Sequence, residues 1–290
     1  MKKFIIMIPV FNDWISLKHL LSEIDNEIKD IKQVEFNCYV INDSSTTNQP
    51  KFIKPNNFNS LKIFHMRENK GHARCNAFGI KYLSENINFD YLILMDGDGE
   101  DRPIEIKKLV EKALSGNESS VVAARIKRSE GILFKSLYEI HKLITLIFTG
   151  KKINFGNYSC LRKKDVMKLS KKKSLWSSFS GSVKKHLSNL DEIQSIRGLR
   201  YFGPSKMSLL NLVLHSFSII AVFKNIVIIR SLLVFFILIF LKDNLGFFSL
   251  IIQILIILFC FIIFAVSFRE NKKMLDQSNL NLDRIEEITH

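Results

Sequence analysis

The stretch 91-YLILMDGDGEDRP-103 joins a short apolar run, Tyr91–Met95, to a turn that carries four carboxylates. A short apolar run that stops abruptly is typical of a buried strand, and here the acidic groups follow its carboxyl end. Alternate positions of an extended segment point the same way, so Asp96, Asp98 and Glu100 are expected to converge on one hard cation such as Mg²⁺. The alternative is a solvated acidic turn, because an isolated Asp-x-Asp is a weak motif.

Further apolar runs predict the sheet to which this strand belongs. They are Phe4–Val10, Phe36–Ile41, Leu61–Met66 and Val121–Ala124. Helical spacing of apolar residues predicts a helix after Asp13, a second over about 72–84, and a third from Pro103, with Asn12 or Asp13 capping the first and Asp101 the third. Strands that alternate with helices favour an α/β fold with a parallel, doubly wound sheet.

Polar clusters follow three of these strands directly. They are Asn12-Asp13, Asp43-Ser44 and the acidic turn. Ligands of doubly wound sheets bind outside the carboxyl ends of the strands, so we expect the three clusters to form one site.

Composition limits the class of protein further. The chain has 290 residues and a net charge of +14, which suits a partner that is a phosphorylated substrate, an anionic membrane or a nucleic acid. Its four cysteines have no metal or redox spacing, which favours reduced thiols and a cytoplasmic main domain. The apolar N-terminus is interrupted by Pro9 and has no small-residue cleavage site, so we expect no targeting signal.

The last third of the chain is much more apolar than the rest. Residues 207–223 form a helix with a narrow polar stripe, suited to a membrane interface. Ile226–Leu241 is short for a membrane span and Phe247–Phe268 is long enough, so two crossings are expected. Lys224 precedes this hairpin and Arg269 follows it, which favours two cytoplasmic ends. The alternative is a hairpin buried in a soluble core. Residues 269–290 are predicted to be a polar cytoplasmic tail.

The region between the last predicted strand and the apolar third is basic and irregular. The Lys171–Lys173 cluster is interpreted as a solvated face. The loop Asn154–Tyr158, with a glycine between asparagines, predicts a tight turn against a ligand.

Several stretches carry a resemblance when they are taken together. They are Ile8–Asn12, Asn42–Ser45, Asn69–Asn76, Met95–Pro103, Arg125–Arg128, Asn154–Tyr158 and Arg200–Lys206. With these stretches the chain resembles the family 2 glycosyltransferases of GT-A fold, and the apolar hairpin narrows the resemblance to the branch of dolichol-phosphate mannose synthase and the bacterial polyprenyl-phosphate glycosyltransferases. Each stretch is weak alone, but their order and spacing over residues 4 to about 270 are specific. The implied organisation is a cytoplasmic GT-A domain over 1–200, a juxtamembrane segment over 201–225 and two transmembrane helices over 226–268.

The resemblance also implies roles for individual residues. A nucleotide-sugar donor linked to UDP or GDP would be held by Pro9, Phe11, Asn12, Asp43, Asn69, Gly71, Asn76, Asp96 and Gly97. Asp96 and Asp98 would hold Mg²⁺ or Mn²⁺ on the diphosphate, with Glu100 where close relatives use glutamine. Without the resemblance, Asp43 would be a turn or helix cap, and Gly71 a requirement of its turn.

Basic residues would serve the acceptor. Arg125 and Arg128 would be catalytic together with Asp98, because the arginine fork binds phosphate oxygens in a bidentate manner. They would hold the acceptor phosphate with Arg200, Ser205 and Lys206, although Arg200 and Lys206 also suit an ordinary positive flank of a membrane helix.

Two departures from the family pattern bear on the acceptor. Asn42 and Asn154 stand where the family commonly has aspartates. An amide cannot act as a general base, which a sugar hydroxyl needs and an already anionic phosphate does not. Asn154 therefore favours a lipid phosphate as acceptor.

The combined prediction is a metal-dependent, inverting glycosyltransferase of a bacterial-type inner membrane. It would move a sugar from a nucleotide-sugar to a polyprenyl phosphate for surface glycan assembly. The rivals are a membrane-anchored enzyme that acts on a glycan hydroxyl and a non-catalytic scaffold of the same fold. Nucleic acid is not expected as a partner, because the basic residues cluster toward the apolar third rather than among aromatics. A second copy of the chain is left open as a partner.

Overall fold

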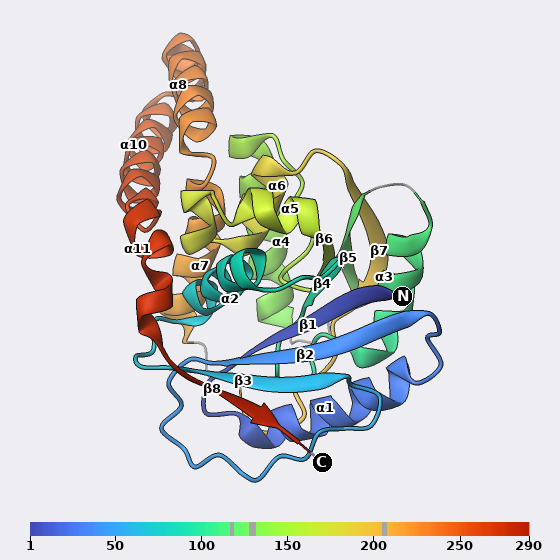
Figure 1. The fold of residues 1–290 in the computed structure, drawn as a ribbon. Helices are drawn as coiled ribbons and strands as arrows, with labels where there is room; N and C mark the ends of the chain where they lie inside the picture. The colour runs from blue at the N-terminus through green and yellow to red at the C-terminus, as the bar shows by residue number, and fades with distance from the viewer. Residues whose placement is uncertain (117–118, 128–131, 205–207, 290) are drawn as a thin grey trace.

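A single mixed sheet forms the centre of the computed structural model, which describes residues 1–116, 119–127, 132–204 and 208–289 (Figure 1). The strands are β1 (Lys2–Val10), β2 (Val34–Asn42), β3 (Ser60–Met66), β4 (Tyr91–Leu94), β5 (Ser120–Lys127), β6 (Ser159–Arg162), β7 (Leu190–Ile196) and β8 (Leu282–Ile288). Their spatial order is β7-β5-β6-β4-β1-β2-β3-β8. Strands β1 to β4 pair in parallel, as do β5 and β7, whereas β6 and β8 run antiparallel to their neighbours. The expected mostly parallel sheet is confirmed.

Helices cover both faces of this sheet. The α-helices are α1 (Trp14–Ile28), α2 (His72–Asn86), α3 (Ile106–Leu114), α4 (Ile132–Thr149), α5 (Lys163–Leu169), α6 (Phe179–His186), α7 (Leu209–Ala221), α8 (Lys224–Phe240), α9 (Lys242–Leu245), α10 (Phe247–Ser267) and α11 (Lys272–Asp276). Short 3₁₀ turns are η1 (Pro103–Glu105), η2 (Lys173–Trp176) and η3 (Ser278–Asn281).

The continuous apolar run of β1 follows from this two-sided cover. Phe4, Ile6 and Ile8 pack into the core with α1 and α3, whereas Ile5 and Met7 pack into the opposite core with α2, α5 and α6. A strand that is buried on both faces cannot alternate apolar with polar residues. The carboxyl ends of β1, β2 and β4 consequently meet at one edge, where the polar clusters lie.

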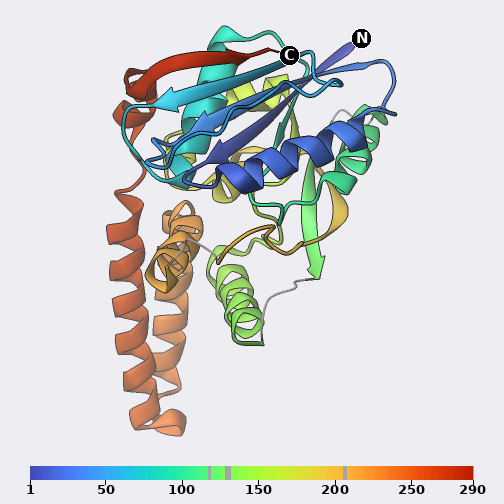
Figure 2. The ribbon, with the colours of Figure 1, turned by 90° about the horizontal axis from the view of Figure 1, so that it is seen from below.

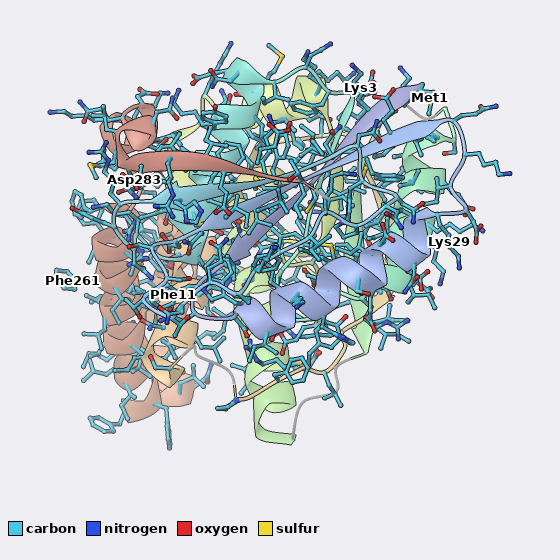
Figure 3. The ribbon with its side chains drawn as sticks, turned by 60° about the horizontal axis from the view of Figure 1, so that its bottom comes forward. Met1, Lys3, Phe11, Lys29, Phe261 and Asp283 are labelled. Carbon is cyan, nitrogen blue, oxygen red and sulfur yellow. The ribbon has the colours of Figure 1, made fainter. Side chains whose placement is uncertain are left out.

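Two long apolar helices, α8 and α10, run side by side away from the sheet (Figures 1 and 2). Many of their side chains are exposed, and Figure 3 shows the Phe261 ring projecting outward from α10. Within the described residues, α10 is the one helix that by itself is long and apolar enough to cross a membrane. Residues Leu210–Ala221 of α7 pass the same test only together with α8, from which they are bent by 88°.

The residues after this hairpin differ from the predicted polar tail. Asn271 caps α11 through a hydrogen bond from Met274 N to its Oδ1 (2.9 Å), and Leu275 is fully buried. Strand β8 then joins the edge of the sheet and pairs antiparallel with β3. The sequence did not predict this strand, because β8 is an edge strand whose charged residues give no apolar alternation.

Candidate active site

The acidic turn is held by its own residues, by the start of helix α2 and by the loop before β6. Strand β4 ends at Leu94, and Asp96 Oδ1 lies 3.0 Å from His72 Nε2 and 3.0 Å from Asn157 Nδ2. Asp101 is buried and its Oδ2 accepts a hydrogen bond from Asp96 N (3.0 Å). Asp101 therefore does not cap the helix after Pro103, because its carboxylate closes the acidic turn instead.

Arginines from the segment after β7 pair with the remaining carboxylates. Arg200 contacts Asp98 (Nη1 to Oδ2, 2.8 Å) and also Asp13, whereas Arg197 pairs with Glu100. Asp13 likewise makes no capping bond to α1. The sequence predicted that Asp13 caps a helix and that Glu100 binds a metal. In the structure each of the two carboxylates pairs with an arginine instead.

The three carboxylates predicted to converge do not do so. Among the described residues no group of three His, Cys, Asp or Glu side chains is placed to hold a metal ion. The reason is local: the chain leaves the strand conformation at Leu94 and turns at Gly97 and Asp98, so the alternation of an extended segment no longer applies. Asp96 and Asp98 remain as the adjacent acidic pair.

Burial and mutual repulsion shape the ionisation of this turn. Burial opposes the ionisation of Asp96, but His72 and Asn157 outweigh it and hold the pKa of Asp96 below its usual value. Burial and the charge of Asp96 raise the pKa of Asp98, and the same causes raise that of Asp101 to about 7. Asp98 and Asp101 are thus harder to ionise than Asp96, whose charge His72 and Asn157 stabilise.

Such a donor set fits a divalent cation. Mg²⁺ is usually held by one or two carboxylates together with phosphates of the substrate, and Asp96 and Asp98 supply this number. A cation near them would relieve the repulsion that raises the pKa of Asp98. Glu100 fits less well as a ligand, because its carboxylate pairs with Arg197.

The segment that supplies the arginines lies directly on the acidic turn. Gly198 N donates to Glu100 O (2.8 Å), and Tyr201 N donates to Asp98 O (3.0 Å). Gly99 has a φ of +89°, and a Cβ at this position would lie 2.3 Å from Cε2 of Tyr201. We call residues 197–202 the cover segment, since they overlie the turn.

Replacing Gly99 with alanine is therefore expected to damage the site. Overpacking of this kind costs about 1–3 kcal/mol of stability, and the Tyr201 ring would have to move away from the turn. Gly116→Ala is the matched control, because Gly116 has the same φ of +89° but no described atom outside its chain neighbours within 4 Å of the added Cβ. Thermal unfolding should show a clearly lower midpoint for Gly99→Ala than for Gly116→Ala; equal midpoints would contradict the close packing of Tyr201.

The loop after β3 is held by Asp43, at the end of β2. Asp43 is buried, and its two carboxylate oxygens accept from Lys70 N (3.0 Å) and Gly71 N (2.8 Å). Burial raises the pKa of Asp43, while these two amide donors oppose the rise. The carboxylate thus fixes the loop of residues 67–71, which we call the donor loop, and Asn69 lies exposed on it.

The other residues predicted to bind the donor lie in three places. Asn12 Oδ1 accepts from Thr46 N (2.7 Å) and Thr47 N (3.0 Å), and Phe11 is 39% exposed beside it. Gly97 packs on β1, where an added Cβ would lie 3.0 Å from the carbonyl oxygen of Pro9. Asn76 is fully buried, and its amide has no hydrogen-bond partner among the described residues.

Substitution of Asp43 tests the donor loop. In Asp43→Ala the Lys70 and Gly71 amides lose their charged acceptor, a loss of about 1.5–3 kcal/mol per hydrogen bond to a charged group when nothing replaces it. We expect the donor KM to rise about tenfold or more while the protein still folds. Asp43→Asn retains one acceptor oxygen and should fall between wild type and alanine. A donor KM that is unchanged in Asp43→Ala would contradict this role of the donor loop.

Of the basic residues predicted to serve the acceptor, Arg125 and Arg200 reach the site. The Arg125 guanidinium lies against Gly156, where an added Cβ would be 2.3 Å from Nη2, and that Nη2 is 3.9 Å from Asp101 Oδ1. Arg128, Ser205 and Lys206 lie outside the described residues, so their roles stay predictions. Asn154 donates to Glu192 Oε2 (3.3 Å), and the neighbouring Asn157 is the residue of its loop that contacts Asp96.

The site also contains residues to which sequence reasoning gave no role. They are His72, Asn157, Arg197 and Tyr201. His72, Asn157 and Tyr201 lie inside stretches that resemble the family, which was a usable signal. Arg197 had no such signal, because its partner Glu100 lies far away in the sequence.

Solved glycosyltransferase structures share this fold. Glucosyl-3-phosphoglycerate synthase from Mycobacterium tuberculosis, solved with Mn²⁺, UDP and glucosyl-3-phosphoglycerate, is 11% identical, has a TM-score of 0.52, and matches over 78% of this chain and 80% of its own. A mannosyltransferase from Pyrobaculum calidifontis, solved with GDP-mannose and Mn²⁺, is 10% identical, has a TM-score of 0.51, and matches over 77% and 63%. The chain therefore has the GT-A fold.

Sequence comparison defines the family. The profile described as Glycosyl transferase family 2 matches residues 5–179, more than half of the chain. The chain belongs to glycosyl transferase family 2, and it is a glycosyltransferase.

Individual relatives that match the chain are distant in sequence. An uncharacterised protein of Methanocaldococcus jannaschii is 25% identical over 54% of this chain and 68% of the relative. Undecaprenyl-phosphate 4-deoxy-4-formamido-L-arabinose transferase of Salmonella choleraesuis is 24% identical over 73% of this chain, and the enzyme of the same name from Klebsiella pneumoniae is 26% identical over 55%. The chain spans 64% of the Salmonella and 47% of the Klebsiella enzyme.

Proposed function

We propose that this glycosyltransferase moves a sugar from a nucleotide-sugar to a polyprenyl phosphate at a membrane surface. The observation that carries the proposal is the position of Arg200. Its guanidinium contacts Asp98 in the acidic turn, and the chain that bears it leads on to α7 and the apolar hairpin. A guanidinium between the acidic turn and an apolar surface can bind the phosphate of an acceptor that is attached to a lipid.

The apolar surface extends beyond the hairpin. Ile140, Leu143 and Ile147 are exposed on α4, whose C-terminal end is tied to α8 by a hydrogen bond from Arg230 Nη1 to Ile147 O (2.9 Å). Figure 2 shows α4 at the same end of the molecule as α7, α8 and α10. Contiguous exposed apolar surface of this kind supports a membrane-bound enzyme.

The orientation follows from the charges that flank the hairpin. Lys224 begins α8, and Arg269, Lys272 and Lys273 follow α10. Basic flanks favour the cytoplasmic side for both ends, which gives two crossings and a catalytic domain in the cytoplasm. For a bacterial-type cell this is the inner membrane.

In the proposed reaction, an oxygen of the acceptor phosphate attacks the anomeric carbon of the sugar. The bond from that carbon to the diphosphate breaks, and the nucleoside diphosphate leaves with the electron pair, so the configuration inverts. Asp96 and Asp98 would hold Mg²⁺ or Mn²⁺, which when bound neutralises charge on the diphosphate. Arg125 and Arg200 would stabilise the phosphate groups, since guanidinium is fully charged and matches phosphate geometry.

Incubation of membranes with labelled nucleotide-sugars and undecaprenyl phosphate tests the proposal. Label that is extracted by organic solvent only when the lipid phosphate is added supports it. Label that appears only on polysaccharide would contradict a lipid acceptor and support transfer to a glycan hydroxyl. Absence of any nucleotide-sugar binding would favour a non-catalytic scaffold. The sugar and the nucleobase would be identified by the same screen.

A further inference from the structure

The chain that follows the apolar hairpin returns to the sheet next to the donor loop. We call residues 272–288 the return segment. Leu275 of α11 packs into the core that contains α2, and β8 pairs with β3 from Leu61↔Ile288 to Met66↔Leu282 (Figure 1). The ladder has an irregularity between His65 and Met66, at its end nearest the donor loop.

Asn281 continues the pairing beyond this irregularity. Its carbonyl oxygen accepts from Arg67 N (2.8 Å). Its side-chain Oδ1 accepts from Glu68 N (3.1 Å), and its Nδ2 donates to Glu68 O (2.9 Å). The side-chain amide thus binds both backbone groups of Glu68 as a neighbouring strand would.

These bonds fix one end of the donor loop, and Asp43 fixes the other. Glu68 directly precedes Asn69, and Lys70 and Gly71 donate their amides to Asp43. A short loop held at both ends has little freedom to lose when a ligand binds, which favours affinity.

A second contact connects the return segment to the end of β3 and to the loop after β2. Glu286 Oε2 lies 3.0 Å from His65 Nε2 and accepts from Gln49 Nε2 (3.1 Å). The other ring nitrogen of His65 lies 3.1 Å from Asn42 Nδ2, beside Asp43. The return segment therefore contacts the loops that follow both β2 and β3.

We propose that Asn281 is a positioning residue for the donor nucleotide and that the return segment completes the donor site. The apolar hairpin and the nucleotide end of the sheet are thereby joined through one continuous stretch of chain. This inference rests on the proposed use of a nucleotide-sugar. The chemistry that Asn281 supports is recognition of a nucleoside diphosphate by the donor loop, not the transfer step.

The experiment compares Asn281→Ala with Asn279→Ala in the full-length, membrane-inserted protein. Asn279 belongs to the same turn, is exposed and makes no side-chain hydrogen bond to the described part of the chain. In Asn281→Ala we expect the dissociation constant for UDP or GDP, whichever the wild type binds, and the donor KM to rise about tenfold. The kcat should stay within about twofold, because the lost contacts act equally in ground and transition state.

Hydrogen exchange of the nucleotide-free protein gives a second readout. The amides of Lys70 and Gly71 should exchange at least about tenfold faster in Asn281→Ala, with no change in Asn279→Ala. A wild type that binds nucleotide, with an Asn281→Ala variant that binds it equally well, would overturn this inference alone. So would a fall in kcat at constant KM, or an equal effect of both variants. A wild type that binds no nucleotide would overturn the proposed function and this inference together.

Discussion

Asp98→Asn is expected to reduce sugar transfer by about a thousandfold or more. The substitution keeps the shape of the side chain but removes the charge that would hold the cation, which is worth several kcal/mol in the transition state. It also removes the ion pair between Asp98 and Arg200. The backbone should be little disturbed, because the asparagine carbonyl oxygen can still accept the hydrogen bond that Glu100 N makes to Asp98 (3.0 Å).

Transfer rates of purified variants at saturating donor and Mn²⁺ check this expectation. Asp30→Asn is the matched control, because Asp30 is exposed after α1 and its loss changes the net charge equally. Both variants should be recovered from the membrane fraction in wild-type amounts. Transfer by Asp98→Asn at the wild-type rate would contradict the assignment of the acidic turn as the metal site.

Arg200→Ala is expected to lower transfer to the lipid by about a hundredfold or more while it strengthens binding of Mn²⁺. Loss of a charged contact to a phosphate in a partly buried site costs about 3 kcal/mol. The opposite effect on the metal arises because Arg200 pairs with Asp98, one of the two carboxylates that would hold the cation, so its charge competes with the metal there. Removal of a competing pair of about 1 kcal/mol should tighten Mn²⁺ binding about fivefold.

The two effects are measured separately. Mn²⁺ binding is followed by electron paramagnetic resonance without lipid, and transfer is followed with undecaprenyl phosphate as acceptor. Lys29→Ala at the end of α1 removes the same charge from an exposed position and should leave both quantities unchanged. Arg200→Lys should keep most of the competition with the metal but recover transfer only in part, because an ammonium lacks the bidentate fork. Weaker Mn²⁺ binding in Arg200→Ala would contradict the competition.

The strands that are buried on both faces, and the polar motifs that follow them, were predictable from the sequence. Continuous apolar runs at Phe4–Val10 and Tyr91–Met95 mark strands buried on both sides, and the polar residues that follow them mark the carboxyl edge. Strands β6 and β7 were not predicted, since each takes its place from antiparallel or edge pairing rather than from a strong pattern of its own.

The resemblance to the family predicted the position of the site more accurately than it predicted the partners of the individual side chains. Asp96, Asp98, Asp43 and Gly97 lie at the carboxyl edge of the sheet, as expected. Asp101 accepts from the backbone amide of Asp96 within its own turn. Asp13 and Glu100 are bound by arginines from a distant segment, which the sequence did not predict. Contacts between residues so far apart in the chain leave no periodic signal.

The acidic stretch Tyr91–Pro103 shows what the sequence determines and what only the tertiary structure decides. The sequence alone determined a buried strand that ends in carboxylates at the ligand-binding edge of an α/β sheet. This is possible because the burial of a strand and the alternation of its side chains depend on residues that are neighbours in the sequence. Only the tertiary structure decided which basic side chain meets which carboxylate, since Arg197, Arg200 and His72 approach from other segments of the chain. It alone also showed that the last residues of the chain close the donor loop through Asn281, because an edge strand acquires its register from the neighbour with which it pairs.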